Sequence, residues 1–203
     1  DEVDLENITP LLEGPTIGGR IGGDGQVFDV YGEPILTSYL CADSVRIEDK
    51  PVGDIRFHAD WSKETGSVAL NGELTRGPVK ALDFMGRMEP RNANKLDVDL
   101  VFDRFDLTFI EPYLPEGISD IQGLVTGTVA VAGNLERPMV NGVVDLKDAG
   151  LRIDYLNTLY TFSNEVKIAP DMFALDLVTL RDELGNTARI GGTILHDGLS
   201  DWN

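Results

Sequence analysis

Apolar and polar residues alternate along much of the chain with a period of two. Between residues 96 and 103 the even positions hold Leu, Val, Leu and Phe, while aspartates occupy positions 97, 99 and 103. Such alternation is typical of strands with one apolar and one solvated face. Turn-forming pairs interrupt it about every 8–12 residues, among them Asn71-Gly72, Gly133-Asn134, Asn141-Gly142 and Gly185-Asn186. Strands this closely spaced cannot be parallel, since a parallel connection needs about a dozen residues. The sequence therefore predicts an all-β antiparallel meander.

An internal repeat divides the chain. The pattern apolar-Asp-Leu-x-x-Ile-x-Pro-x-Leu, followed by Glu-Gly, begins at Val3 and again at Phe105. Collinear matches continue downstream: Ile17, Gly19, Gly23, Val27 and Pro34 align with Ile121, Gly123, Gly127, Val131 and Pro138, and Gly66, Val68, Leu70, Gly72 and Leu74 align with Gly185, Ala188, Ile190, Gly192 and Ile194. A series across most of both halves predicts two tandem repeats, residues 1–104 and 105–203.

Each repeat is predicted to begin with a short helical turn. Asp4 and Asp106 stand where an N-cap acceptor is favoured. Pro10 and Pro112 are expected to end the turns early, because the residue before a proline is pushed out of the α region.

The charge of the chain restricts its partners. Thirty-five acidic residues against 17 basic ones give a net charge of −18, and the basic residues are scattered singly. This argues against binding to nucleic acid or to an anionic membrane surface, both of which need clustered cations. No apolar run approaches the roughly 18 residues that span a bilayer, so the segment is expected to be soluble.

Candidate chemistry is sparse. His58 and His196 occupy no ligand spacing, and Cys41 is the single cysteine. The glycine-rich stretch 18–25 lacks the Lys-Ser/Thr of a phosphate loop, and the aspartates of 97–103 lack the glycine and glutamate of an EF-hand. The sequence therefore predicts no catalytic residue, no metal site, no cofactor and no enzymatic activity.

The second half of the chain carries a recognisable motif. Gly123, Gly127, Gly133-Asn134-Leu135-Glu136-Arg137-Pro138 and Gly142 follow the order G-x-x-x-G…G-x-L-x-x-P-x-x-x-G. This stretch resembles the AsmA-like and TamB proteins, as do residues 155–158 and 182–196. The resemblance covers most of 105–203 directly and 1–104 through the duplication.

The resemblance implies a fold and a role. The implied fold is an elongated antiparallel sheet curled into an open trough with an apolar concave face. The implied protein is periplasmic, is anchored in the inner membrane and reaches an outer-membrane barrel of the Omp85 type. It would move phospholipid between the membranes or help outer-membrane proteins insert, and its partners in this segment would be acyl chains.

Alternation selects a candidate lining for such a trough. Asp145, Asp176 and Arg189 are predicted to lie on the opposite face. The lining candidates are Val125, Val129, Val131, Val144, Phe173, Leu175, Leu177, Ile190 and Ile194. The alternative is a structural or adhesive β-repeat in which the same residues form a closed core. An enzymatic β-helix acting on carbohydrate would require carboxylates gathered on one face, and those of this chain are dispersed.

Overall fold

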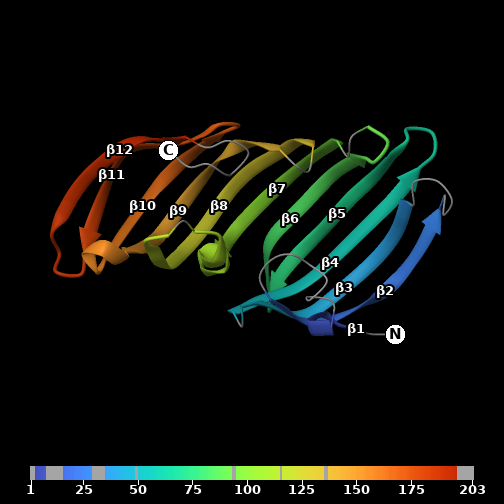
Figure 1. Cartoon of the computed structure of the whole chain (residues 1–203), viewed down its shortest axis with the longest axis horizontal. Coiled ribbons are helices and arrows are strands. Elements are labelled where there is room, and N and C mark those ends of the chain that lie inside the picture. Colours follow the sequence, from blue (N-terminus) through green and yellow to red (C-terminus); the bar gives the residue numbers. More distant parts are fainter. Residues whose placement is uncertain are drawn as a thin grey trace. The chain divides into compact units, whose positions relative to one another are not determined.

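The chain forms a single sheet of 12 antiparallel strands. A computed structural model describes residues 3–7, 16–28, 35–48, 50–92, 95–114, 116–134 and 137–195. The strands follow one another in sequence order from β1 to β12, and the sheet is not closed (Figure 1). The all-β antiparallel fold predicted from the alternation is confirmed. No helix in these ranges is long and apolar enough to cross a membrane.

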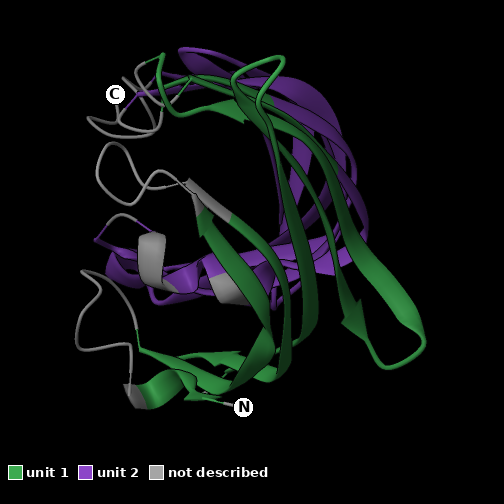
Figure 2. Ribbon diagram, turned by 90° about the vertical axis from the view of Figure 1, so that its right-hand side faces the viewer, with its two compact units in different colours: residues 1–100, 131–136 green, residues 101–130, 137–203 purple. Residues whose placement is uncertain are grey.

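The elements divide between two compact units, which comprise residues 1–100 with 131–136 and residues 101–130 with 137–203 (Figure 2). The first elements are β1 (Val3–Asp4), η1 (Leu5–Asn7), β2 (Ile17–Phe28), β3 (Ile35–Ile47), β4 (Lys50–Ser62), β5 (Ser67–Arg76), β6 (Val79–Glu89) and β7 (Lys95–Asp106). The others are η3 (Leu107–Tyr113), β8 (Ile118–Asn134), β9 (Pro138–Ile153), η4 (Asp154–Leu156), β10 (Thr158–Ala169), β11 (Met172–Asp182) and β12 (Thr187–Leu195).

Strand register gives unit 1 one apolar and one polar face. Ile55 of β4 pairs with Leu74 of β5, which pairs with Leu82 of β6. One residue further along β4, Arg56 pairs with Glu73 on the other face. The apolar face of unit 1 comprises Ile21, Leu40, Ala42, Ile55, Phe57, Ala59, Trp61, Val68, Leu70, Leu74, Leu82, Phe84 and Met88.

Unit 2 is built in the same way. Val144 of β9 pairs with Val166 of β10, which pairs with Leu175 of β11. Its apolar face comprises Val140, Val144, Leu146, Val166, Ile168, Phe173, Leu175, Val178, Ile190 and Ile194. Asp145 pairs with Glu165 on the opposite face, and both are exposed.

Glycines at matched positions allow strands to approach closely where they bend. Gly23 and Gly127 have φ of 146° and 147°, a region that side chains rarely adopt. A Cβ at Gly23 would lie 2.0 Å from the carbonyl oxygen of Tyr39, and one at Gly127 would lie 2.4 Å from that of Val143. Both strands therefore require glycine, and the strands of unit 1 curve along their length (Figure 2).

Two of the predicted turns lie inside strands. Asn71-Gly72 is in the middle of β5 and Asn141-Gly142 is in β9. At Gly72 the ring of Phe84 fills the space of a side chain, since its Cζ would be 2.3 Å from an added Cβ. Phe84 also stacks on Phe57, with ring centroids 6.0 Å apart. The aromatic ring protects a glycine that would otherwise weaken the strand.

The predicted helical turns are present as short 3₁₀ helices. Asp4 Oδ1 accepts a hydrogen bond from the Glu6 amide at 3.0 Å, and Asp106 Oδ1 accepts one from the Thr108 amide at 2.9 Å. The capping role of both aspartates is confirmed. Pro10 lies outside the described residues, and η3 continues one residue beyond Pro112 to Tyr113. The division into repeats at residues 104 and 105 stays a prediction.

Ser38 is expected to be a weak point of the apolar face. This residue of β3 is buried opposite Ala59, and its Oγ has no hydrogen-bond partner among the residues that the structure describes. Because an unpaired buried hydroxyl costs free energy, Ser38→Ala should raise the free energy of unfolding by about 1 kcal/mol, measured by urea denaturation. In the control Ser163→Ala, a hydroxyl that accepts from the Asp148 amide at 2.9 Å is removed, so stability should not rise. A loss of stability in Ser38→Ala would contradict the expectation.

The turn between β11 and β12 depends on one carboxylate. Asp182 accepts hydrogen bonds from the side-chain and backbone nitrogens of Asn186, both at 2.8 Å, and from the Leu184 amide at 3.0 Å. The hydrogen bond from the Asn186 side chain is the main cause that holds the pKa of Asp182 below its ordinary value. A lowered pKa in the folded state means that this stabilisation is complete above the ordinary carboxyl pKa and is lost as the pH falls through the lowered one.

Acid should therefore loosen this turn. Amides of residues 183–190 are expected to lose hydrogen-exchange protection as the pH falls below about 4, after correction for the intrinsic exchange rate. In Asp182→Ala the same amides should exchange fast at every pH. Protection that does not change with pH in the unsubstituted chain would contradict the role given to Asp182.

Candidate functional site: an uncovered apolar face

The predicted lining residues fall mostly on the apolar face. Val144 and Leu175 are joined across β10 by Val166, and Phe173 pairs with Ile194 of β12. Val125 and Val129 of β8 are buried, and the Cα of Val129 would lie 2.8 Å from a Cβ added at Gly142 of β9. Val131 lies on β8 as well, in the part that belongs to unit 1, and is half-buried.

Leu177 departs from this arrangement. A register shift in β11 places Leu175 opposite Gly192 but Val178 opposite Ile190, so that one residue is inserted between them. Such a bulge reverses the alternation downstream. Leu177 is consequently 77% exposed, and Val178, at 2%, takes the place on the apolar face that the sequence assigned to Leu177.

The apolar face of unit 1 has no second layer among the described residues. Every strand belongs to the one sheet, and the helices η1, η3 and η4 are 3₁₀ segments of three to seven residues. The small residues Ala59 and Val68 are nonetheless buried, packed against Phe57, Trp61 and Leu70. These three large side chains are only half-buried, so they cover their neighbours and keep apolar surface exposed themselves.

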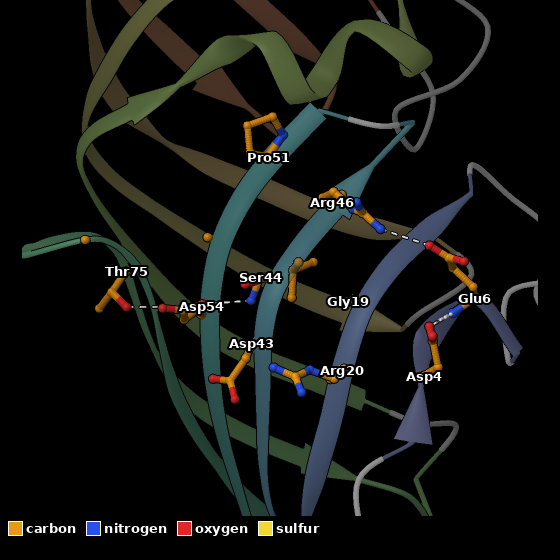
Figure 3. A pocket seen from close by; sticks show the side chains of 13 residues that line it. Asp4, Glu6, Gly19, Arg20, Asp43, Ser44, Arg46, Pro51, Asp54 and Thr75 are labelled. Atoms are coloured by element: carbon orange, nitrogen blue, oxygen red, sulfur yellow. Dashed lines mark hydrogen bonds and ion pairs between the residues drawn. The ribbon is translucent and has the colours of Figure 1, made fainter.

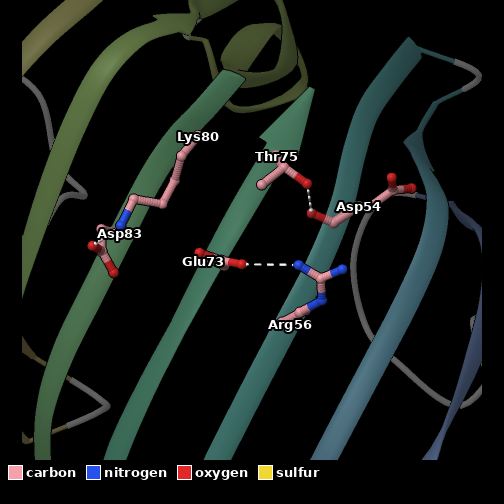
Figure 4. A network of polar contacts seen from close by, with 6 residues as sticks. All are labelled: Asp54, Arg56, Glu73, Thr75, Lys80 and Asp83. Carbon is pink, nitrogen blue, oxygen red and sulfur yellow. Dashed lines mark hydrogen bonds and ion pairs between the residues drawn. The ribbon is translucent and has the colours of Figure 1, made fainter. Parts of the chain in front are cut away.

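The opposite face carries ion pairs. Arg56 Nη1 of β4 lies 3.0 Å from Glu73 Oε1 of β5. Lys80 and Asp83, both on β6, form a second ion pair (Figure 4). The hydrogen bond to Glu73 raises the pKa of Arg56, and that to Asp83 raises the pKa of Lys80. The four side chains keep between 32% and 60% of their surface exposed to solvent, so these pairs contribute little stability. They offset positive charge that would otherwise attract an anion.

A polar depression of about 460 Å³ lies where β2, β3 and β4 bend (Figure 3). Its lining contains four carboxylates and two guanidiniums, those of Arg20 and Arg46. Arg46 pairs with Glu6 at 2.9 Å, and Asp54 accepts a hydrogen bond from the Ser44 amide at 2.8 Å. An excess of negative charge disfavours phosphate at this position. Alternation along the strands did not predict this depression, because it forms at bulges.

The residues considered for chemistry are dispersed. His58 Nε2 lies 3.4 Å from Asp60 on the same strand, and Cys41 is a half-buried free thiol. His196 lies outside the described residues. Within the described ranges no three His, Cys, Asp or Glu side chains gather as metal ligands would. The aspartates of residues 97–103 are exposed along β7, as the alternation predicted.

Comparison with known proteins identifies two relatives. Selenide, water dikinase of Desulfitobacterium hafniense strain Y51 is 29% identical over 143 residues, and that of strain DSM 10664 / DCB-2 is 27% identical over the same length. Each match covers 68% of this chain and 41% of the relative. The chain therefore spans less than half the length of these relatives. No family model and no solved structure matches.

These relatives contradict one prediction. The sequence was interpreted as that of a protein without enzymatic activity, whereas both relatives are named as enzymes. The prediction considered only the side chains of this chain. The match covers 41% of each relative, and side chains in the remaining part of those enzymes can also contribute to their activity.

Proposed function

We propose that the apolar face forms the lining of a groove that guides lipid acyl chains, in a segment of a periplasmic protein similar to TamB. The observation that carries the proposal is the continuity of this face. In unit 1 it runs from Leu40 through Phe57 and Leu70 to Phe84 with no described layer over it. In unit 2 it runs from Val144 to Ile194.

The energy of lipid transfer favours such a surface. An acyl chain of about 16 carbons loses on the order of 12 kcal/mol of favourable burial when it enters water, at about 0.8 kcal/mol per CH₂. A continuous apolar path removes most of that barrier without any bond being made or broken. Half-buried side chains such as Phe57 and Leu70 provide this contact at the surface.

The proposed groove recognises the tail rather than the head group. Arg56, Lys80 and Lys167 each pair with a carboxylate on the polar face, at Glu73, Asp83 and Asp176 respectively. The net charge of −18 also repels anionic head groups. Affinity should accordingly rise with acyl chain length and change little between head groups.

Photo-crosslinking in cells tests the groove. A probe at position 175 or 129, on the apolar face, is expected to yield lipid adducts, whereas a probe at exposed position 143 on the polar face should not. Leu175→Asp should block lipid passage and leave the fold intact, because the half-buried Leu175 position can hydrate a charge. Loss of adducts at 175, together with collapse of the thermal transition in Leu175→Asp, would instead favour the closed structural core.

The names of the two relatives favour a second candidate, phosphoryl transfer to selenide and water. The purified chain would be incubated with a nucleoside triphosphate and selenide, and ³¹P NMR would detect a phosphorus–selenium product. A heat-denatured sample is the matched control. Product formation would support this candidate, and its absence would leave the acyl-chain groove as the better proposal.

A further inference from the structure

The hairpins β3–β4 and β9–β10 contain the same bulge. Ser44 of β3 and Asp148 of β9 each lie at a one-residue insertion, with φ of 54° and 48°. The Ser44 amide donates to Asp54 Oδ1 of β4 at 2.8 Å. The Asp148 amide donates to Ser163 Oγ of β10 at 2.9 Å. Because backbone and cap agree, the bulge identifies which positions of the two hairpins correspond.

Measured from this bulge, the second hairpin is longer than the first. In unit 1 Ile47 pairs with Lys50 at the end of the hairpin. In unit 2 Leu151 stands at the same distance from the bulge and pairs with Tyr160, and the hairpin continues through residues 152–159. The sheet of unit 1 forms without this extension. The fold therefore does not require it, and its side chains are available for another role.

Large apolar side chains stand in solvent at this end of unit 2. Tyr155 and Leu156 of η4 are 94% and 50% exposed, and Leu184, in the turn between β11 and β12, is 88% exposed. The two turns lie at the same end of the sheet, because Tyr160 of β10 pairs with Asp182 of β11 (Figure 1). Tyr155, Leu156 and Leu184 form what we call the apolar tip. Apolar side chains gathered in solvent in this way are typical of an interaction site.

The extension that carries Tyr155 is held in place by polar contacts. The Asp154 amide donates to the carbonyl oxygen of Gly117 at 3.0 Å, and the Asp154 carboxylate accepts from Ser119 Oγ at 2.5 Å. Asn157 closes η4 with φ of 47°, and its amide donates to the Asp154 carbonyl oxygen at 3.0 Å. An aromatic side chain on a backbone that is already ordered loses little conformational entropy when it binds a partner.

Acidic side chains surround the apolar tip. Arg152 is the basic residue of the extension, and it pairs with Asp120 at 2.6 Å. The hydrogen bond from Asp120 is the main cause that raises the pKa of Arg152, and the charges of Glu183 and Asp154 add to it. With Arg152 neutralised, Asp154, Asp182 and Glu183 leave an excess of negative charge beside the tip. This charge repels an anionic membrane surface and attracts Lys and Arg side chains of a protein.

A further strand of the chain itself would not cover the β9–β10 hairpin. In the sequence repeat, β5 of unit 1 corresponds to β12, and β6 is the strand that pairs beyond it. With β6 in place, Glu48 at the end of the shorter hairpin is still exposed. The chain also leads away from the tip along β12, since Leu195 pairs with Met172 at the other end of β11. A second copy of the chain is disfavoured as well, because each copy carries a net charge of −18.

We propose that the apolar tip docks into a partner protein, in an apolar recess whose rim carries Lys or Arg side chains. Tyr155 is the central anchor, because an ordered and exposed tyrosine is a common hot spot of protein interfaces. Such a recess matches both the apolar side chains and the carboxylates of Asp154 and Glu183 beside them. A bilayer of zwitterionic lipid offers no excess of positive charge to those carboxylates. The proposal does not depend on the acyl-chain groove, whose lining lies on the strands.

Photo-crosslinking at the tip tests this docking. A photoreactive phenylalanine at position 156 in cells is expected to yield a protein adduct, and mass spectrometry should place the crosslinked partner residue in an apolar recess flanked by Lys or Arg. Tyr155→Ser should lower the adduct yield about tenfold, because an aromatic anchor is lost. Glu183→Lys should also lower it, since the new charge repels the basic rim. Leu177→Ser is the matched control, because Leu177 is 77% exposed but lies outside the tip, and the yield should be unchanged.

A shortened hairpin separates docking from folding. Replacing residues 152–159 with the Glu-Asp dipeptide found at positions 48 and 49 should abolish adducts from a probe at position 184 and retain a cooperative thermal transition. Adducts to lipid, to the chain itself or to a second copy would each overturn the proposal, as would an adduct yield that Tyr155→Ser leaves unchanged or the absence of any adduct. Sedimentation with phosphatidylcholine vesicles that Tyr155→Ser abolishes would replace the protein partner with a membrane.

Discussion

Replacing Val144 with aspartate is expected to lower the free energy of unfolding by about 3–4 kcal/mol, one of the largest single effects in the chain. Val144 is 6% exposed and pairs with Val166 on the apolar face of unit 2. The substitution removes a buried isopropyl group and introduces a charge that no described basic side chain on this face can neutralise. Urea denaturation followed by circular dichroism measures the change.

The neighbouring residue is the matched control. Val143 is 45% exposed and pairs with Lys167 on the polar face, so Val143→Asp should leave stability unchanged or raise it slightly. Equal destabilisation by the two substitutions would mean that the two faces of β9 do not differ in burial as described.

Replacing Gly127 with valine is expected to unfold unit 2 or to destabilise it by about 3 kcal/mol or more, because two costs combine at this position. The backbone φ of 147° is strained for any side chain, and the new Cβ would lie 2.4 Å from the carbonyl oxygen of Val143. Calorimetric melting gives the loss directly.

Gly192→Ala serves as the control for that substitution. No described atom lies within 4 Å of the added Cβ, and the backbone conformation is ordinary. The melting temperature should stay within about a degree of the unsubstituted chain, because surface substitutions of this kind change stability by about 0.5 kcal/mol or less. Comparable losses at Gly127 and Gly192 would contradict the close strand approach assigned to Gly127.

The alternation of residues was sufficient to predict the strands and their faces where no bulge intervenes. In β7, Asp97, Asp99 and Asp103 were expected on the solvated face, and all three are exposed. Leu177 was misplaced because the residue inserted in β11 is a backbone feature that no local residue pattern specifies.

Glycine was the other source of error. Asn71-Gly72 predicts a turn from local preferences, yet Gly72 lies within β5 because Phe84, 12 positions further along the chain, covers it. This contact belongs to tertiary structure and is not visible in the dipeptide. The interpretation of Gly185-Asn186 as a turn was correct, since Asp182 and Asn186 close the loop between β11 and β12.

The candidate lining could be predicted because it depends only on which face a residue occupies. The polar depression at Arg20 and Arg46 could not, since bulges at Gly19 and Ser44 bring its residues together. Matched glycines at 19 and 123, with φ of 127° and 114°, agree with the duplication in local backbone geometry. Superposing the two halves would test the duplication itself.

The strict neighbour-to-neighbour order of the strands has a mechanical consequence. Each described pairing joins strands that are consecutive in sequence, so every hairpin is a local unit with a short loop-closure distance. Force applied to the two chain ends acts first on the terminal strands. Each terminal strand pairs with only one neighbour, so it can separate from the sheet without disturbing the interior strands. A single molecule pulled in this way should lengthen in small steps, each the length of one hairpin. When the force is released, the strands should pair again one after another, starting at the edge of the sheet that is still folded.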